Sequence, residues 1–123
     1  TITGDGDFLM NGQELATAVQ YSAPVLFIVL NNNMYGTIRM HQERDYPARV
    51  HGSGLQNPDF AALARAYGAH GEIVERTQDF ASAFERAVSA GRPAVLEVRI
   101  DPEAISTRTT LTQVREQALK ARR

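Results

Sequence analysis

The sequence predicts an α/β protein with a mostly parallel sheet and helices on both faces. Three observations support this prediction: strand-like apolar runs alternate with helix-period segments, one run is apolar throughout, and polar turns follow two of the strands. The 123 residues, 43% of them hydrophobic, suffice for one compact core. A single domain over residues 1–123 is therefore expected.

Four segments are predicted to form strands. Residues 25–30 (Val-Leu-Phe-Ile-Val-Leu) form a continuous apolar run rich in β-branched residues, as in a strand buried on both faces. This strand is expected at the centre of the sheet. Further strands are expected at residues 1–3, 72–75 and 94–100.

The first and last predicted helices carry capping-box patterns. The first is expected to begin at Asn11, paired with Glu14, and to run to about Tyr21. The last is expected to begin at Thr110, paired with Gln113, and it ends in cations that favour a helix C-terminus.

Two central helices are predicted from their apolar periodicity. One opens at Asn57-Pro58, a cap followed by proline, and stops at Gly68; the other covers residues 78–90. Their apolar faces are expected to bury Phe60, Leu63, Ala64, Tyr67, Phe80, Phe84, Ala87 and Val88.

Residues 45–56 show neither a helical nor a strand period. A loop this long is often functional, and we expect it to cover the site described below. Arg39 and Glu43 are expected to be solvated charges. Histidines 41, 51 and 70 are expected to be surface or packing residues, and Ser53 a loop residue.

The composition excludes several classes of function. With 13 basic and 14 acidic side chains and no long run of one sign, no surface for nucleic acid or an anionic membrane is expected. The absence of cysteine excludes a disulfide scaffold, a thiolate zinc site and a cysteine nucleophile, and it fits the cytoplasm. The longest apolar run, 24–30, is too short to cross a bilayer. Because the chain begins on a strand-like segment without methionine, we expect a fragment of a larger protein.

Two polar turns follow the first two predicted strands. These are residues 4–7 (Gly-Asp-Gly-Asp) and 31–33 (Asn-Asn-Asn), and parallel strands would bring them to the same sheet edge. The glycines are expected to allow positive φ and close approach of a ligand, and the amides of Gly6, Asp7 and Phe8 to face an anion. Two aspartates beside a phosphate would repel it, so a divalent cation is expected between them.

The available ligands are hard oxygens: the Asp5 carboxylate, the Asn32 amide oxygen and backbone carbonyls. This set suits magnesium or calcium and not zinc. Other glycine-acid motifs do not match. A Walker loop requires lysine and a hydroxyl residue after Gly6, an EF-hand from Asp5 or Asp7 lacks its required residues, and a dinucleotide fingerprint requires a third glycine.

The segment from Gly4 to Asn32 resembles the thiamine diphosphate fingerprint of the decarboxylase and carboligase superfamily, in particular its acetolactate synthase-like group. Gly-Asp-Gly is followed, after the 24 residues from Asp7 to Leu30, by Asn-Asn. The likeness covers nearly the whole chain and implies the diphosphate-binding, C-terminal domain of a thiamine diphosphate-binding fold. It implies magnesium ligation by the side chains of Asp5 and Asn32 and by the main-chain carbonyl of Met34. The residues expected to bind the cofactor are Gly4, Asp5, Gly6, Asp7, Phe8, Asn32, Met34, Tyr35 and Gly36.

The resemblance also implies what lies outside the chain. The glutamate that activates the cofactor belongs to a separate pyrimidine-binding domain of a partner subunit, so no catalytic residue is expected here, and the parent enzyme is expected to be a homo-oligomer acting on a small 2-oxo acid.

Two departures concern the branch of the family. His41 stands where acetolactate synthases usually carry tryptophan, and Thr37 replaces a common methionine. A decarboxylase that makes no acetolactate is therefore an alternative. Another is a non-catalytic, magnesium-dependent module that binds a phosphate ligand, or a structural domain whose asparagines only cap turns.

Overall fold

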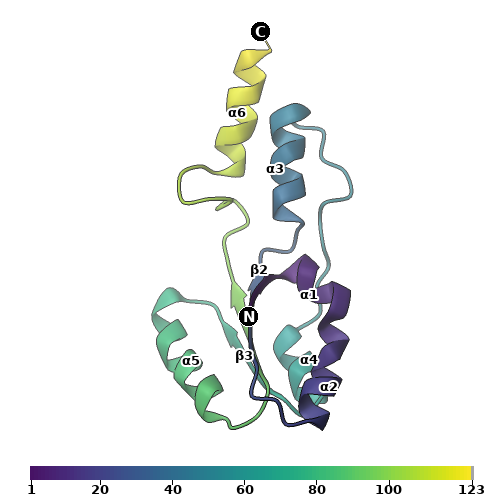
Figure 1. Ribbon diagram of the computed structural model, residues 1–123. Helices are drawn as coiled ribbons and strands as arrows, with labels where there is room; N and C mark the ends of the chain where they lie inside the picture. Colours follow the sequence, from purple (N-terminus) through teal and green to yellow (C-terminus); the bar gives the residue numbers. More distant parts are fainter. Residues whose placement is uncertain (123) are drawn as a thin grey trace. The chain divides into compact units, whose positions relative to one another are not determined.

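The computed structural model describes residues 1–122 and confirms the α/β class (Figure 1). The chain divides into two compact units. The first comprises Thr1–Asn31 and Asn57–Arg99, and the second comprises Asn32–Gln56 with the segment from Ile100 onward. Each unit is described by itself below.

The first unit contains a four-stranded parallel sheet, counted over the described residues, with the order β1-β2-β4-β3. Its strands are β1 (Ile2–Gly4), β2 (Leu26–Asn31), β3 (His70–Val74) and β4 (Ala94–Arg99). All four predicted strands are confirmed. The apolar run 25–30 overlaps β2 in all but its first residue, and β2 pairs on both sides as expected for a central strand.

Helices cover both faces of this sheet, as Figure 1 shows. Alternate residues of β2 and β4 point to opposite faces, so the sheet supports two cores. One core joins the sheet to α1 (Asp5–Asn11), α2 (Leu15–Gln20) and α4 (Phe60–Ala66), and the other joins it to α5 (Phe80–Ser89). The first core contains Phe8, Leu15, Val29, Phe60, Ala64, Ala69 and Val95; the second contains Val74, Ala83, Ala87, Ala94 and Leu96.

The helical region after β1 begins earlier than predicted. Helix α1 starts at Asp5, directly after the strand, and is followed by a 3-10 turn (η1, Gly12–Glu14) before α2. The predicted capping box is wrong, because the Asn11 side chain makes no cap hydrogen bond and Glu14 accepts one from the Thr17 hydroxyl instead.

The cap of α4 is Asp59, whose carboxylate accepts from the Ala62 amide at 2.6 Å, and not Asn57 as predicted. The predicted stop is confirmed, because Gly68 follows with φ +88°. Helix α5, preceded by a 3-10 turn (η2, Thr77–Asp79), lies where expected. Its buried face was mispredicted in part: Phe84 and Val88 are exposed.

The second unit contains α3 (Gly36–Asp45) and α6 (Leu111–Ala121), which pack together. The capping box at Thr110 and Gln113 is confirmed, whereas α3 was not predicted. The expectation that Glu43 is solvated is wrong, because its side chain is fully buried. Its carboxylate accepts hydrogen bonds from Arg39, Arg115 and the Ala48 amide.

Candidate functional site

The Gly-Asp-Gly motif lies at the carboxyl edge of the sheet. Gly4 pairs with Leu30 in the register of β1 and β2, so Asp5, which follows β1, and Asn31, which ends β2, lie at the same edge of the sheet. Ligands of open α/β sheets bind at this edge. The predicted meeting of the first and second polar turns is therefore confirmed as far as Asn31, the last residue of β2.

The Asp5 carboxylate is buried, with 2% of the residue exposed. Its Oδ1 accepts a hydrogen bond from the Gly6 amide at 3.0 Å, and its Oδ2 accepts one from the Asn57 side-chain amide at 2.7 Å. Each carboxylate oxygen has two lone pairs, so each retains one for another partner.

No lysine, arginine or histidine within residues 1–122 forms an ion pair with Asp5. A buried carboxylate held only by neutral donors is costly unless a cation completes its environment. The same stretch of chain holds no cluster of three His, Cys, Asp or Glu side chains able to cage a metal. A magnesium ion held by Asp5 would have to complete its coordination with amide, carbonyl, phosphate and water oxygens.

The two glycines of the motif do not use positive φ as predicted. Gly4 is extended, with φ −76°, and Gly6 lies in the first turn of α1. The Gly6 amide is engaged by Asp5, so its predicted freedom to face an anion is also wrong. Asp7 is exposed, whereas the Phe8 side chain is in the core, packed edge-on against two other rings.

The remaining predicted residues, Asn32 to Gly36, belong to the second unit. The Asn32 Oδ1 accepts from the Met34 amide at 3.2 Å, which fixes the direction of this side chain. The Tyr35 amide donates to the Ser53 carbonyl at 2.9 Å, and Met34 forms an antiparallel bridge with Gly54. The loop after α3 thus braces the predicted ligand segment.

Gly36 lies close to two side chains of its own unit. A Cβ at this position would lie 3.0 Å from the Asn32 Nδ2 and 3.2 Å from the Ile105 Cδ1. A side chain at this position would require these two neighbours to shift by a few tenths of an ångström. Asn32, a predicted magnesium ligand, and Gly36, predicted to line the diphosphate, are therefore close neighbours.

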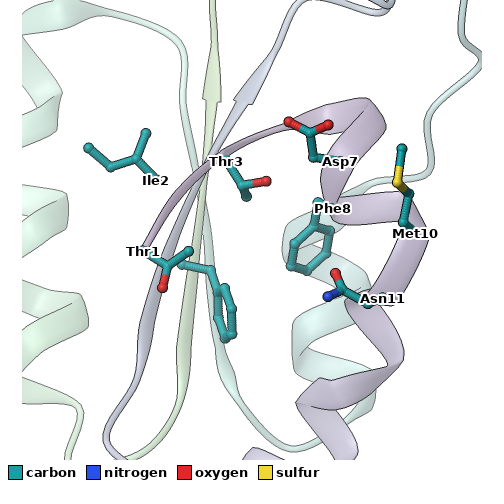
Figure 2. A pocket seen from close by; sticks show the side chains of 8 residues that line it. Thr1, Ile2, Thr3, Asp7, Phe8, Met10 and Asn11 are labelled. Carbon is teal, nitrogen blue, oxygen red and sulfur yellow. The ribbon is translucent and has the colours of Figure 1, made fainter.

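A pocket of about 420 Å³ lies beside β1 and α1 (Figure 2). Asp7 and Phe8 are the predicted site residues that line it, together with residues of β1 and with Met10. Asp5 is not part of this lining, so the pocket does not coincide with the proposed metal position.

Two residues of the Asp5 environment were missed from the sequence. Asn57 was interpreted as a helix cap, and Glu97 as one residue of an apolar strand. Glu97 is 1% exposed; its Oε1 accepts from the Asn31 amide and its Oε2 from the Phe60 backbone amide, both at 2.9 Å. A carboxylate inside the apolar run 94–98 was the available signal.

The chain matches known proteins over most of its length. Residues 1–98 match the family model described as thiamine pyrophosphate enzyme, C-terminal TPP binding domain. The chain is 36% identical, over 81% of its length, to the acetolactate synthase isozyme 2 large subunit of Escherichia coli. It is 38% identical, over 83% of its length, to a putative thiamine pyrophosphate-containing protein of Bacillus subtilis. It spans 18% of each relative.

Solved structures agree with this match. The benzoylformate decarboxylase of Polynucleobacter necessarius aligns with a TM-score of 0.77 at 32% identity, covering 84% of this chain and 19% of that one. The thiamine diphosphate-dependent 4-hydroxybenzoylformate decarboxylase of Rhodococcus jostii aligns with a TM-score of 0.76 at 35% identity, covering 81% and 19%. The chain therefore belongs to the thiamine pyrophosphate enzyme family, and it corresponds to the C-terminal TPP-binding domain of these enzymes.

Proposed function

We propose that this chain is the diphosphate- and magnesium-binding domain of a thiamine diphosphate-dependent 2-oxo acid decarboxylase or carboligase. The observation that carries the proposal is the Asp5 carboxylate, buried at the carboxyl edge of the sheet and held by neutral donors. When bound, thiamine diphosphate supplies a carbanion that adds to the carbonyl of the 2-oxo acid and then accepts the electrons left by carbon dioxide.

We assign three magnesium ligands: the side-chain oxygens of Asp5 and Asn32 and the main-chain carbonyl of Met34. The hydrogen bond from the Met34 amide to Asn32 supports the assignment, because it orients the Asn32 oxygen and leaves one of its lone pairs for a metal. Backbone and side-chain groups of Gly4, Gly6, Asp7, Phe8, Tyr35 and Gly36 would line the diphosphate.

This chain positions the cofactor and does not activate it. The activating glutamate would come from the pyrimidine-binding domain of a partner subunit in a homo-oligomer, so the isolated chain would release no carbon dioxide from a 2-oxo acid. Within residues 1–122, no helix combines the length and apolar character needed to cross a membrane. Separately, we propose that the parent enzyme is cytoplasmic.

A second candidate within the family is a decarboxylase that makes no acetolactate. The absence of tryptophan, with His41 at the position where acetolactate synthases usually carry it, favours this candidate. The two aromatic 2-oxo acid decarboxylases among the structural neighbours make an aromatic substrate a sensible choice for the assay. Acetolactate formation from pyruvate by the parent enzyme would exclude this candidate.

The central test is calorimetric titration of the full-length parent enzyme with thiamine diphosphate, with and without a chelator. We expect binding only in the presence of magnesium, because Asp5 and the diphosphate repel each other without it. Equal affinity in both titrations would contradict the proposal. Binding without carbon dioxide release from any 2-oxo acid would instead favour a non-catalytic binding module.

A further inference from the structure

Asn57 connects the Asp5 carboxylate to the sheet. Its side-chain nitrogen donates to Asp5 Oδ2 at 2.7 Å and to Asn31 Oδ1 at 2.9 Å. A primary amide nitrogen carries two hydrogens, so both donors are used. Asn57 lies 52 residues from Asp5 and 26 from Asn31 along the chain, yet it joins the ends of β1 and β2.

A buried carboxylate anchors the other end of this network. Asn31, 6% exposed, donates its own side-chain amide to Glu97 Oε1 at 2.9 Å. Glu97 Oε2 accepts from the amide of Phe60, the first residue of α4 and three residues after Asn57. Glu97 is therefore linked to Asn57 by two routes, one through the side chain of Asn31 and one through the Phe60 amide at the start of α4.

The choice of donor at Asp5 has a physical consequence. A lysine or arginine in place of Asn57 would neutralise the carboxylate and weaken its attraction for a cation. A neutral amide fixes the carboxylate rotamer and leaves its charge available, as partners of metal ligands commonly do. The Asn57 side-chain amide donates one hydrogen to Asp5 and the other to Asn31. Because Asn31 is itself held by Glu97, Glu97 helps to fix the orientation of Asn57 through Asn31.

From this geometry we infer that Asn57 is a positioning residue for the metal ligand Asp5, and that Glu97 fixes the orientation of the Asn57 side chain through Asn31. The inference rests on the proposed function, since it assigns to Asp5 the magnesium ion proposed above. It adds a specific consequence: the affinity for magnesium depends on a residue that does not itself contact the ion.

The test is Asn57→Ala in the full-length parent enzyme. Magnesium is titrated at saturating thiamine diphosphate, and the cofactor is then titrated at saturating magnesium. We expect the Kd for magnesium to rise about tenfold, the lower end of the range for partners of metal ligands. We expect saturating magnesium to restore cofactor binding, because the ligands themselves remain.

Asp59→Ala is the matched control. Asp59 caps the same helix, two residues from Asn57, by accepting from the Ala62 amide. Its removal weakens the start of α4 without removing a donor to Asp5, so the Kd for magnesium should stay within twofold of the wild type. An equal rise in both variants would show that Asn57 only supports α4, and would overturn the inference.

Asp5→Ala separates the inference from the function on which it rests. If Asp5→Ala abolishes magnesium-dependent binding and Asn57→Ala changes nothing, the proposed function stands and the positioning role is wrong. If Asp5→Ala also changes nothing, the proposed function itself is wrong. Should Asn57→Ala not fold, Asn57→Ser carries the same test, because a hydroxyl can donate to only one of the two acceptors. A wild-type Kd for magnesium in that variant would equally overturn the inference.

Discussion

Two buried carboxylates of this molecule have opposite surroundings. Glu43, in the second unit, is met by the guanidinium groups of Arg39 and Arg115, with nitrogen–oxygen distances of 2.6–3.0 Å. Asp5, in the first unit, is met by one backbone amide and one side-chain amide. Both side chains are almost fully removed from solvent.

The different donors around these two side chains distinguish a carboxylate with a structural role, Glu43, from a carboxylate suited to binding a metal ion, Asp5. Glu43 is neutralised within its own unit, so its hydrogen bonds serve to hold α3 against α6. Asp5 has no cationic partner within residues 1–122, and a buried carboxylate is unfavourable unless a cation is supplied. The predictions below test this contrast, beginning with the largest expected effect.

The first prediction concerns pH. The hydrogen bond from Arg115 is the main cause that lowers the pKa of Glu43 from 4.5 to about 2. A lowered pKa stabilises the folded chain at pH values above the unfolded pKa, and this contribution is lost as the pH falls from 4.5 towards 2. It amounts to about 3 kcal/mol. Urea unfolding of wild type and Glu43→Gln should therefore differ by a constant amount near neutral pH, and the difference should shrink through this window.

A difference that stays constant down to pH 2 would contradict the ion-pair account of Glu43. The comparison between the two chains removes the contributions of Asp45 and Glu72, whose pKa values are also lowered by neighbouring arginines. These carboxylates are the same in both chains.

The second prediction concerns Asp5 and Asn32. Replacing either by alanine should weaken magnesium-dependent binding of thiamine diphosphate to the parent enzyme by on the order of 100-fold, or about 2.8 kcal/mol, because a direct ligand matters more than its hydrogen-bond partner. Circular dichroism should show a retained fold. Loss of the fold with no specific effect on the cofactor would indicate that these residues only hold turns.

Local patterns in the sequence were sufficient for much of the fold. The apolar run 25–30 identified the central strand, and the Thr110–Gln113 capping box identified the start of α6, because both depend on neighbouring residues. Helix α3 was missed for the opposite reason. It has little apolar periodicity, and its contact with α6 includes the ion pair between Glu43 and Arg115, two residues 72 positions apart.

The same distinction applies to the candidate site. Asp5 was predictable because it lies in a short motif after a strand. Asn57 was interpreted as a helix cap, a role that its neighbour Asp59 performs, because its true partners are 52 and 26 residues away. Hydrogen bonds of this range leave no periodic pattern in the sequence.

The third prediction concerns Arg115. Arg115→Ala removes the stronger partner of a buried carboxylate and should lower the free energy of unfolding by about 2 kcal/mol, less than for a fully buried pair, since Arg39 remains and Arg115 is 31% exposed. Urea unfolding measures the loss. Arg108→Ala is a suitable control, because this arginine is exposed and takes part in none of the ion pairs within residues 1–122. Equal stability of the two variants would mean that the ion pair between Glu43 and Arg115 does not contribute to the free energy of unfolding.

The last prediction concerns the helix that presents Arg115 to Glu43. Thr110 caps α6: its hydroxyl accepts from the Gln113 amide at 3.2 Å, and the Gln113 side chain accepts from the Thr110 amide at 3.0 Å. Thr110→Ala removes one of these bonds and should cost about 1 kcal/mol in urea unfolding. Thr112→Ala, an exposed change in the same helix, should cost less because alanine favours helix. If both variants were equally stable, the capping box would contribute little, and the ion pairs of Glu43 would be the main constraint on where α6 packs.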